Sequence, residues 1–148
     1  MSSIHAHGKA MSEERTTNDT YFYSGFQTVT YVGKKYVSVL ESSGWYAGGV
    51  HNTMVTGHTF NLKTGNEVKK ITRFTKTKDL DKLKKEIQAE VEKNGTDSIY
   101  KPETILNRKA TKFNFYINKD GSVKVCFDPY EIGAGGWYRE YVVKGRLK

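Results

Sequence analysis

The sequence predicts an α+β fold in which an antiparallel β-sheet packs against one main amphipathic helix. The 148-residue chain has ten tyrosines and only two prolines, a composition typical of strands. Segments with strand-like composition occupy both halves of the chain, and one segment between them changes to helical spacing. Strands, then one helix, then strands is the order expected when a helix covers one face of an antiparallel sheet.

The first strands are expected in the N-terminal half. Residues 21–43, YFYSGFQTVTYVGKKYVSVLESS, are rich in aromatic and β-branched residues and predict two strands joined by a turn at GKK. The segment TMVTGHTFNL (53–62) predicts a third strand, and KTGNE (63–67) predicts a turn into VKKITRF (68–74). Together these segments predict a β-meander.

The helix is expected in KTKDLDKLKKEIQAEVEKNG (76–95). Its acidic residues Asp79 and Asp81 suit the positive N-terminal end of a helix dipole, and Asn-Gly at 94–95 suits the C-terminal stop. The apolar residues fall three and four positions apart, so they share one stripe of the helix: Leu80, Leu83, Ile87 and Val91.

The remaining strands are expected after residue 111. KFNFYI (112–117), the turn NKDG and SVKVCFD (122–128) predict a hairpin, and WYREYVV (137–143) predicts a last strand. A short helical turn can open at Pro102. The single cysteine, Cys126, lies in a strand-like segment and is expected to be a buried small hydrophobe.

Length and composition predict one structured domain over residues 21–148. Residues 1–20 are polar, contain His5 and His7 as a weak candidate metal pair, and are expected to be a disordered tail or an added leader. The chain contains no signal-peptide pattern and no run of eighteen apolar residues, so no membrane segment is expected.

The net charge of +8, from 24 Lys and Arg against 16 Asp and Glu, favours polyanionic neighbours. Nucleic acid, anionic wall polymers and lipid surfaces all meet that condition. Basic dipeptides are scattered near aromatics, but no helix-turn-helix, zinc finger or aromatic RNA-binding motif accompanies them. Nucleic acid is therefore the least favoured partner.

Catalytic and metal motifs do not stand out. Nucleophile elbows, zinc-binding motifs and phosphate loops are not found, so the chain is expected not to be an enzyme and to need no cofactor. His51 and His58 are seven residues apart, too far along a strand to share one ion, and His58 is expected to be an ordinary hydrogen-bonded histidine. Glu41, Asp128 and Glu131 are acids of the kind that any such chain contains.

Two segments combine glycines with Trp and Tyr: GWYAGGVHN (44–52) and GAGGWYRE (133–140). Glycine pairs suit tight turns or bulges at strand ends, so Gly48, Gly49, Gly135 and Gly136 are expected to be structural. We hypothesise that both loops meet at one end of the sheet as an aromatic binding platform with polar partners, built from Trp45, Tyr46, His51, Tyr130, Glu131, Trp137 and Tyr138. In the structural alternative, the Trp residues cap the core, His51 and Glu131 bind buried backbone groups, and Tyr130 anchors a turn.

Two segments on either side of the expected helix resemble the C-terminal domain shared by RsiV-type anti-sigma factors and PdaC-type peptidoglycan deacetylases. They are, in this order, YVSVLESSGWYAGGVHNTMVTGHTFNLKTGNEV and FNFYINKDGSVKVCFDPYEIGAGG. The resemblance implies an extracytoplasmic, non-catalytic domain, which in the anti-sigma factors belongs to the outer segment that binds lysozyme. The family motifs fall on Gly48, Gly49 and His51, and on Pro129 to Ile132. Here GAGGWY replaces a proline-containing segment, which weakens the transfer of lysozyme recognition.

From the resemblance we expect a cell-envelope domain that recognises wall glycan or a wall-directed protein such as lysozyme. A lysozyme-binding sensor domain of an anti-sigma factor is the alternative, and a basic nucleic-acid-binding domain is a further one. Common lysozymes are themselves basic, so the net charge of +8 favours peptidoglycan or another wall polymer as the partner. The oligomeric state stays open.

Overall fold

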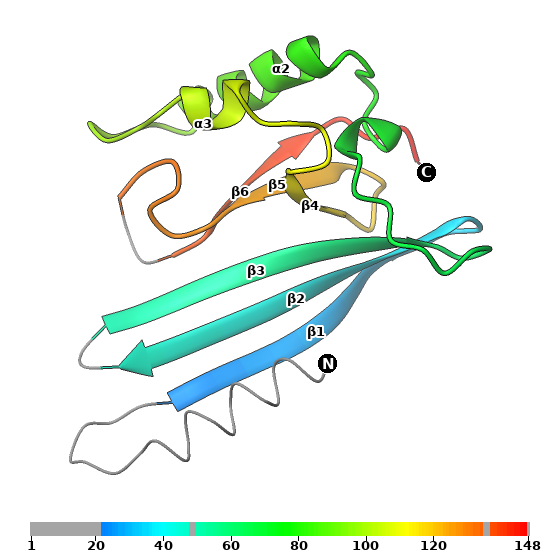
Figure 1. Cartoon of the computed structure of the whole chain (residues 1–148), viewed down its shortest axis with the longest axis horizontal. Helices are drawn as coiled ribbons and strands as arrows, with labels where there is room; N and C mark the ends of the chain where they lie inside the picture. Colours follow the sequence, from blue (N-terminus) through cyan, green and yellow to red (C-terminus); the bar gives the residue numbers. More distant parts are fainter. Residues whose placement is uncertain (1–21, 48–49, 135–136, 148) are drawn as a thin grey trace.

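The computed structural model describes residues 22–47, 50–134 and 137–147. Three layers follow one another in Figure 1: a lower three-stranded sheet, a second three-stranded sheet above it, and helices on top. Both sheets are antiparallel. The expected α+β class is confirmed, but the strands form two sheets and not one.

The first sheet has the order β1-β2-β3 and consists of β1 (Phe22–Val32), β2 (Tyr36–Ala47) and β3 (Val50–Asn61). The predicted turn at GKK is confirmed, since the Gly33 amide donates to the Tyr36 carbonyl at 2.9 Å. The pairing of β2 with β3 keeps one register along its whole length. The sheet is therefore a long ribbon whose far end carries residues 44–47 and 50–53.

The predicted strand at 68–74 is wrong. Only an isolated bridge from Phe60 to Glu67 continues the ladder, and the chain then forms a 3₁₀ helix, η1 (Ile71–Arg73). Ile71 and Phe74 are both fully buried. A three-residue spacing puts both side chains on one side of a 3₁₀ turn, whereas a strand would point them to opposite faces.

The main helix, α2 (Leu80–Lys93), is confirmed. Asp79 caps it by accepting a hydrogen bond from the Lys82 amide at 2.9 Å, and Gly95 follows its C-terminus with φ +93°. The predicted apolar stripe faces the core. Pro102 precedes the expected short helix, α3 (Glu103–Leu106).

The second sheet has the order β4-β5-β6 and consists of β4 (Asn114–Ile117), β5 (Val123–Phe127) and β6 (Arg139–Val143). Its helix-facing side chains form the main core with α2, η1 and α3. Its opposite face carries Tyr116 and Cys126, which pack against Val55 of the first sheet. Cys126 is thus buried as expected, and burial raises the pKa of its thiol.

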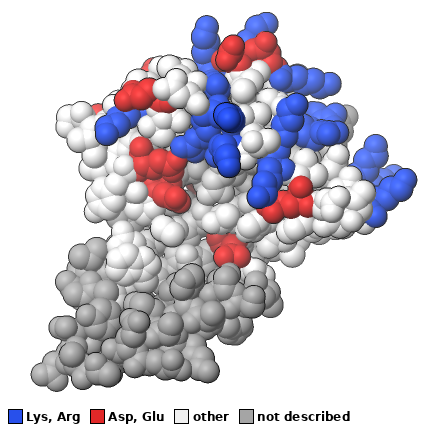
Figure 2. Space-filling view, in the orientation of Figure 1, with Lys and Arg blue, Asp and Glu red and all other residues white. Residues whose placement is uncertain are grey.

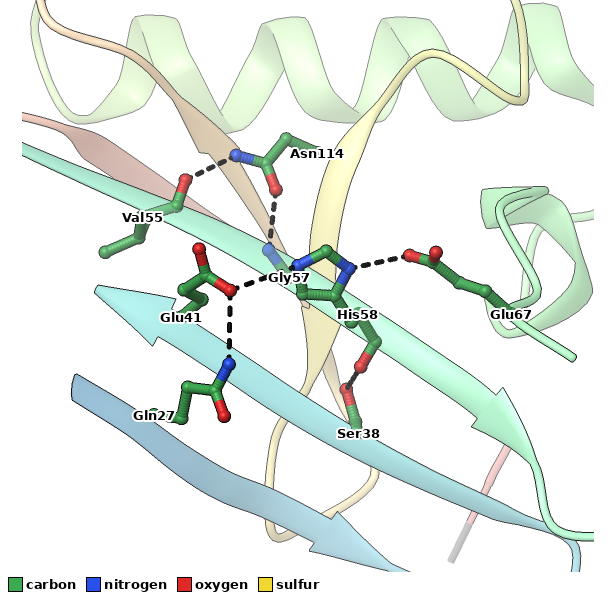
Figure 3. A network of polar contacts seen from close by, with 8 residues as sticks. All are labelled: Gln27, Ser38, Glu41, Val55, Gly57, His58, Glu67 and Asn114. Carbon is green, nitrogen blue, oxygen red and sulfur yellow. Dashed lines mark hydrogen bonds and ion pairs between the residues drawn. The ribbon is translucent and has the colours of Figure 1, made fainter. Parts of the chain in front are cut away.

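Polar side chains join the two sheets (Figure 3). Asn114 of β4 accepts a hydrogen bond from the Gly57 amide at 2.8 Å and donates one to the Val55 carbonyl at 2.7 Å. Buried Ser38 of β2 accepts from the Ile117 amide at 2.9 Å. These bonds satisfy backbone groups that would otherwise be unpaired where strands of different sheets meet.

No helix in the described part of the chain has the length and apolar character needed to cross a bilayer.

Candidate functional site

The far end of the first sheet meets the loop that follows β5. Trp137 forms an isolated parallel bridge with Thr53 of β3, although the two residues are distant in sequence. Thr53 pairs on its other edge with Gly44 of β2, so β3 lies between the start of the first glycine-rich segment and Trp137 of the second. The four glycines Gly48, Gly49, Gly135 and Gly136 lie outside the described residues, as does the tail at 1–20.

Two aromatic residues of this region, Tyr130 and Trp137, are strongly exposed, at 62% and 58%. The Trp137 ring stacks on Tyr138, with centroids 5.8 Å apart and an interplanar angle of 22°. Tyr138 in turn packs against the inter-sheet cluster that contains Val55 and Cys126. Tyr138 therefore connects the exposed indole to the packed interface between the two sheets.

Trp45 and Tyr46 lie at the same end but do not share one surface. They are consecutive residues in the regular part of β2, so their side chains point to opposite faces of the sheet. Both are half-buried. His51 of β3 pairs with Tyr46 of β2, and the His51 side chain is not among the described ones. The strand geometry thus places Trp45 and Tyr46 on opposite faces, so the four rings that the sequence suggested as one platform cannot all share one surface.

Tyr130 occupies a tight turn with unusual backbone geometry. The Glu131 amide donates to the Asp128 carbonyl at 3.1 Å, which makes Pro129 and Tyr130 the central residues of the turn. Tyr130 has φ +64°, and no other described non-glycine residue has a positive φ. Proline followed by a residue with positive φ is typical of a type II turn, where glycine is the preferred second residue. The chain therefore displays an exposed ring at a strained position where no burial compensates the strain.

Replacement of Tyr130 by glycine is expected to stabilise the protein by about 0.5–1 kcal/mol. Relief of the left-handed backbone is worth about 1–2 kcal/mol, and the extra freedom of glycine in the unfolded chain offsets part of it. Urea unfolding measures the change. The control Tyr130→Ala removes the ring but keeps the strain, and it should not stabilise. Destabilisation by the glycine would mean that the ring packs against the protein.

Glu131 anchors this turn to the protein. It accepts a hydrogen bond from the Asp128 amide at 2.6 Å and forms an ion pair with Arg108. The Arg108 guanidinium lies over the rings of Phe113 and Phe127, at 5.6 and 5.5 Å from their centroids. The pKa of Asp128 is raised, mainly by burial and to a smaller extent by the charge of Glu131.

A second anchor holds the loop near its far end. Asp97 accepts a hydrogen bond from the Ala134 amide at 2.8 Å, and Arg139 donates to the Ala134 carbonyl at 2.7 Å. The bond from Ala134 is the main cause of the lowered pKa of Asp97. A Cβ at Gly133 would lie 2.7 Å from the Arg139 guanidinium, so glycine allows the loop to close over this pair. Neither Arg108 nor Asp97 is marked by any local sequence signal, since each meets the loop only in the folded chain.

His58 lies away from this loop, in the network of Figure 3. Its Nδ1 is 2.8 Å from Glu67, and its Nε2 is 3.9 Å from Glu41, which also accepts a hydrogen bond from Gln27. The expected hydrogen-bonded histidine is confirmed. Across the described residues, no group of three His, Cys, Asp or Glu side chains is placed to hold a metal ion. A cavity of about 310 Å³ adjoins His58 and Glu67, between β3 and residues 111–115.

Comparison with known proteins identifies a match for the central part of this chain. Residues 72–136 match DUF3298, a family described as a protein of unknown function. A crystal structure of a DUF3298 family member from Bacteroides fragilis has a similar fold, with a TM-score of 0.62 at 15% sequence identity. The match covers 96% of this chain and 58% of that protein, so this chain spans little more than half of its length. No curated protein matches this chain.

The DUF3298 match contains the turn at Tyr130 and most of the residues that anchor the loop, but not Arg139. Arg108, Glu131, Asp97 and Tyr130 all fall within residues 72–136, together with α2, α3 and the hairpin of β4 and β5. The three strands of the first sheet fall outside it, as does Trp137. At 15% identity the structural likeness establishes the fold alone, and the relation to RsiV and PdaC stays a resemblance.

Proposed function

We propose that this chain is a non-catalytic binding domain of the bacterial cell envelope, and that it binds wall glycan through the exposed rings of Tyr130 and Trp137. The observation that carries the proposal is the display of these two rings on one anchored loop. Flat aromatic faces provide a large contact area at low entropic cost and recur as binding hot spots. The envelope location rests on the sequence resemblance.

The strain at Tyr130 supports a binding role over a structural one. A tyrosine with positive φ persists where the surrounding structure imposes the conformation, and such positions cluster at ligand sites. Arg108 and Asp97 impose that geometry from segments outside the loop, through Glu131 and the Ala134 amide. The loop is therefore pre-organised, which lowers the entropic cost of binding.

Net charge supports wall material over a lysozyme-type protein. The chain carries +8, so a basic lysozyme would experience long-range repulsion unless the contact itself were acidic. A wall with anionic polymers attracts the chain instead. Lysozyme and nucleic acid remain outcomes of the test.

The test is co-sedimentation of the full chain with peptidoglycan stripped of anionic polymers, at low and at high salt. Wild-type protein should be retained at both salt concentrations, because ring stacking on sugars is not electrostatic. Tyr130→Gly and Trp137→Ala should each weaken retention at least about tenfold, the size of a hot-spot loss. The matched control is Phe26→Ala, which removes an equally exposed ring, 62%, from β1.

Three outcomes contradict the proposal. They are no retention of the wild type, retention that high salt abolishes, and equal loss in the Phe26 control. Thermal melts of each variant separate loss of binding from loss of folding. If peptidoglycan is not bound, the same variants titrated against lysozyme and against an oligonucleotide test the other two partners.

A further inference from the structure

A basic cavity lies at the end of the molecule opposite to the aromatic loop. It has a volume of about 350 Å³, within the range of small-ligand sites. Four of its five lining residues are cationic and none is acidic: Lys70, Thr72, Arg73, Lys78 and Arg146. Figure 2 shows Lys and Arg side chains gathered over the upper right of the molecule, where Figure 1 places η1 and the C-terminal segment.

Contacts between two segments, residues 70–78 and 144–146, assemble this cavity. The C-terminal segment pairs with the chain after η1 through a bridge between Thr75 and Gly145, and the Arg146 amide donates to the Phe74 carbonyl at 3.0 Å. The Arg146 Nε also donates to the Arg73 carbonyl, which holds the two arginines side by side. The cations are therefore brought together by the fold and not by a run of basic sequence.

Lys70, Arg73, Lys78 and Arg146 are all exposed, and no carboxylate in the described part of the chain pairs with any of them. The half-buried cations Arg108, Lys124 and Arg139, in contrast, pair with Glu131, Glu140 and Asp97. Like charges that share a cavity repel one another. A bound anion would remove that repulsion.

We propose that this cavity binds the phosphate groups of a polyol phosphate polymer. Guanidinium groups match phosphate oxygens in geometry, and lysines add point charges. Single-stranded nucleic acid offers the same phosphates, but its binding sites combine cations with aromatic rings on which bases stack. The lining residues include no aromatic side chain, so the cavity suits a phosphate chain without bases. This site does not depend on the glycan site of the aromatic loop.

The test uses fluorescence anisotropy with a labelled synthetic poly(glycerol phosphate) chain and a labelled oligo-dT of equal charge. The variant Lys70→Gln/Lys78→Gln removes two exposed cations that make no other polar contact with described residues. The control Lys85→Gln/Lys101→Gln makes the same charge change at exposed lysines outside the cavity lining. The cavity variant should bind poly(glycerol phosphate) at least about tenfold more weakly. The slope of its log binding constant against log salt concentration should become shallower by about two, one for each cation removed.

Equal weakening in both variants would overturn the proposal, because binding would then follow net charge and not this cavity. Absence of binding to poly(glycerol phosphate) would overturn it as well. Tighter binding of oligo-dT, weakened by the same variant, would assign the cavity to nucleic acid. Amide chemical shifts with added glycerol phosphate give a second readout, and the changes should concentrate at residues 70–78 and 144–146.

Discussion

Replacement of Gly57 by alanine is expected to destabilise the protein by about 3 kcal/mol or more. A Cβ on Gly57 would lie 1.8 Å from the Phe115 carbonyl oxygen and 2.4 Å from its carbon. Both atoms belong to the backbone of β4, so no flexible side chain can move aside, and the penalty should reach or exceed the usual cost of overpacking, about 1–3 kcal/mol. Urea unfolding followed by circular dichroism measures the effect.

The same substitution should also weaken the polar connection between the sheets. Separation of β3 from β4 would stretch the 2.8 Å bond from the Gly57 amide to Asn114, and a buried polar group without a partner costs about 1–3 kcal/mol. The matched control is Thr56→Ala at the neighbouring exposed residue, where a loss below about 1 kcal/mol is expected. A Gly57→Ala protein as stable as the control would mean that the two sheets do not approach closely here.

Replacement of Arg108 by methionine is expected to cost about 2–4 kcal/mol and to weaken glycan binding as well. The side chains of Arg108 and Glu131 are only 16% and 24% exposed, so removal of the cation leaves a poorly solvated carboxylate under the turn that carries Tyr130. The contacts of the guanidinium with Phe113 and Phe127 are also lost. Unfolding and peptidoglycan co-sedimentation are measured on the same protein.

Two further variants separate the effect of the lost charge from that of the lost contacts with the aromatic rings. Arg108→Lys keeps the charge but not the planar contact with both rings, so its loss should be smaller than that of Arg108→Met. Lys93→Met breaks an exposed ion pair with Glu90, and its loss should stay below about 0.5 kcal/mol. If Arg108→Met loses stability but binds glycan as the wild type does, the turn at Tyr130 does not take part in binding.

Local signals predicted most of the elements. The spacing of the apolar residues in 80–93 and the residues at its two ends define α2 without reference to the rest of the chain. The hairpin turns were also recognisable, because their residue types suit particular backbone conformations. The failure at 68–74 has a tertiary cause, since burial of both Ile71 and Phe74 requires a turn that the strand-like composition hides.

The buried face of the first sheet could not be read from its pattern. Ser38, Ser42 and Thr59 are buried, whereas Val37 and Val39 on the opposite face are half-buried. An alternation of valine with serine predicts the reverse. The serine and threonine hydroxyls are inside because the strand that crosses them, β4, needs hydrogen-bond partners such as the one Ser38 provides to Ile117.

The residues of the candidate site were also predictable only in part from the sequence. Trp137, Tyr130 and the turn at Pro129 were evident as residue types, because aromatics next to glycine and proline indicate displayed loops. Their supports were not evident. Arg108 and Asp97 meet the loop only through the fold, across 23 and 37 residues of sequence.

By itself the sequence determined the main helix, the hairpins, the net charge and the residues able to form an aromatic surface, because each depends on neighbours along the chain. Tertiary structure alone decided that the strands divide into two sheets and that Arg108 and Asp97 meet the loop that carries Tyr130. It also gathered Lys70, Lys78 and Arg146 around one cavity. These features depend on contacts between distant segments, and packing and long-range hydrogen bonds select those contacts in ways that local residue patterns do not encode.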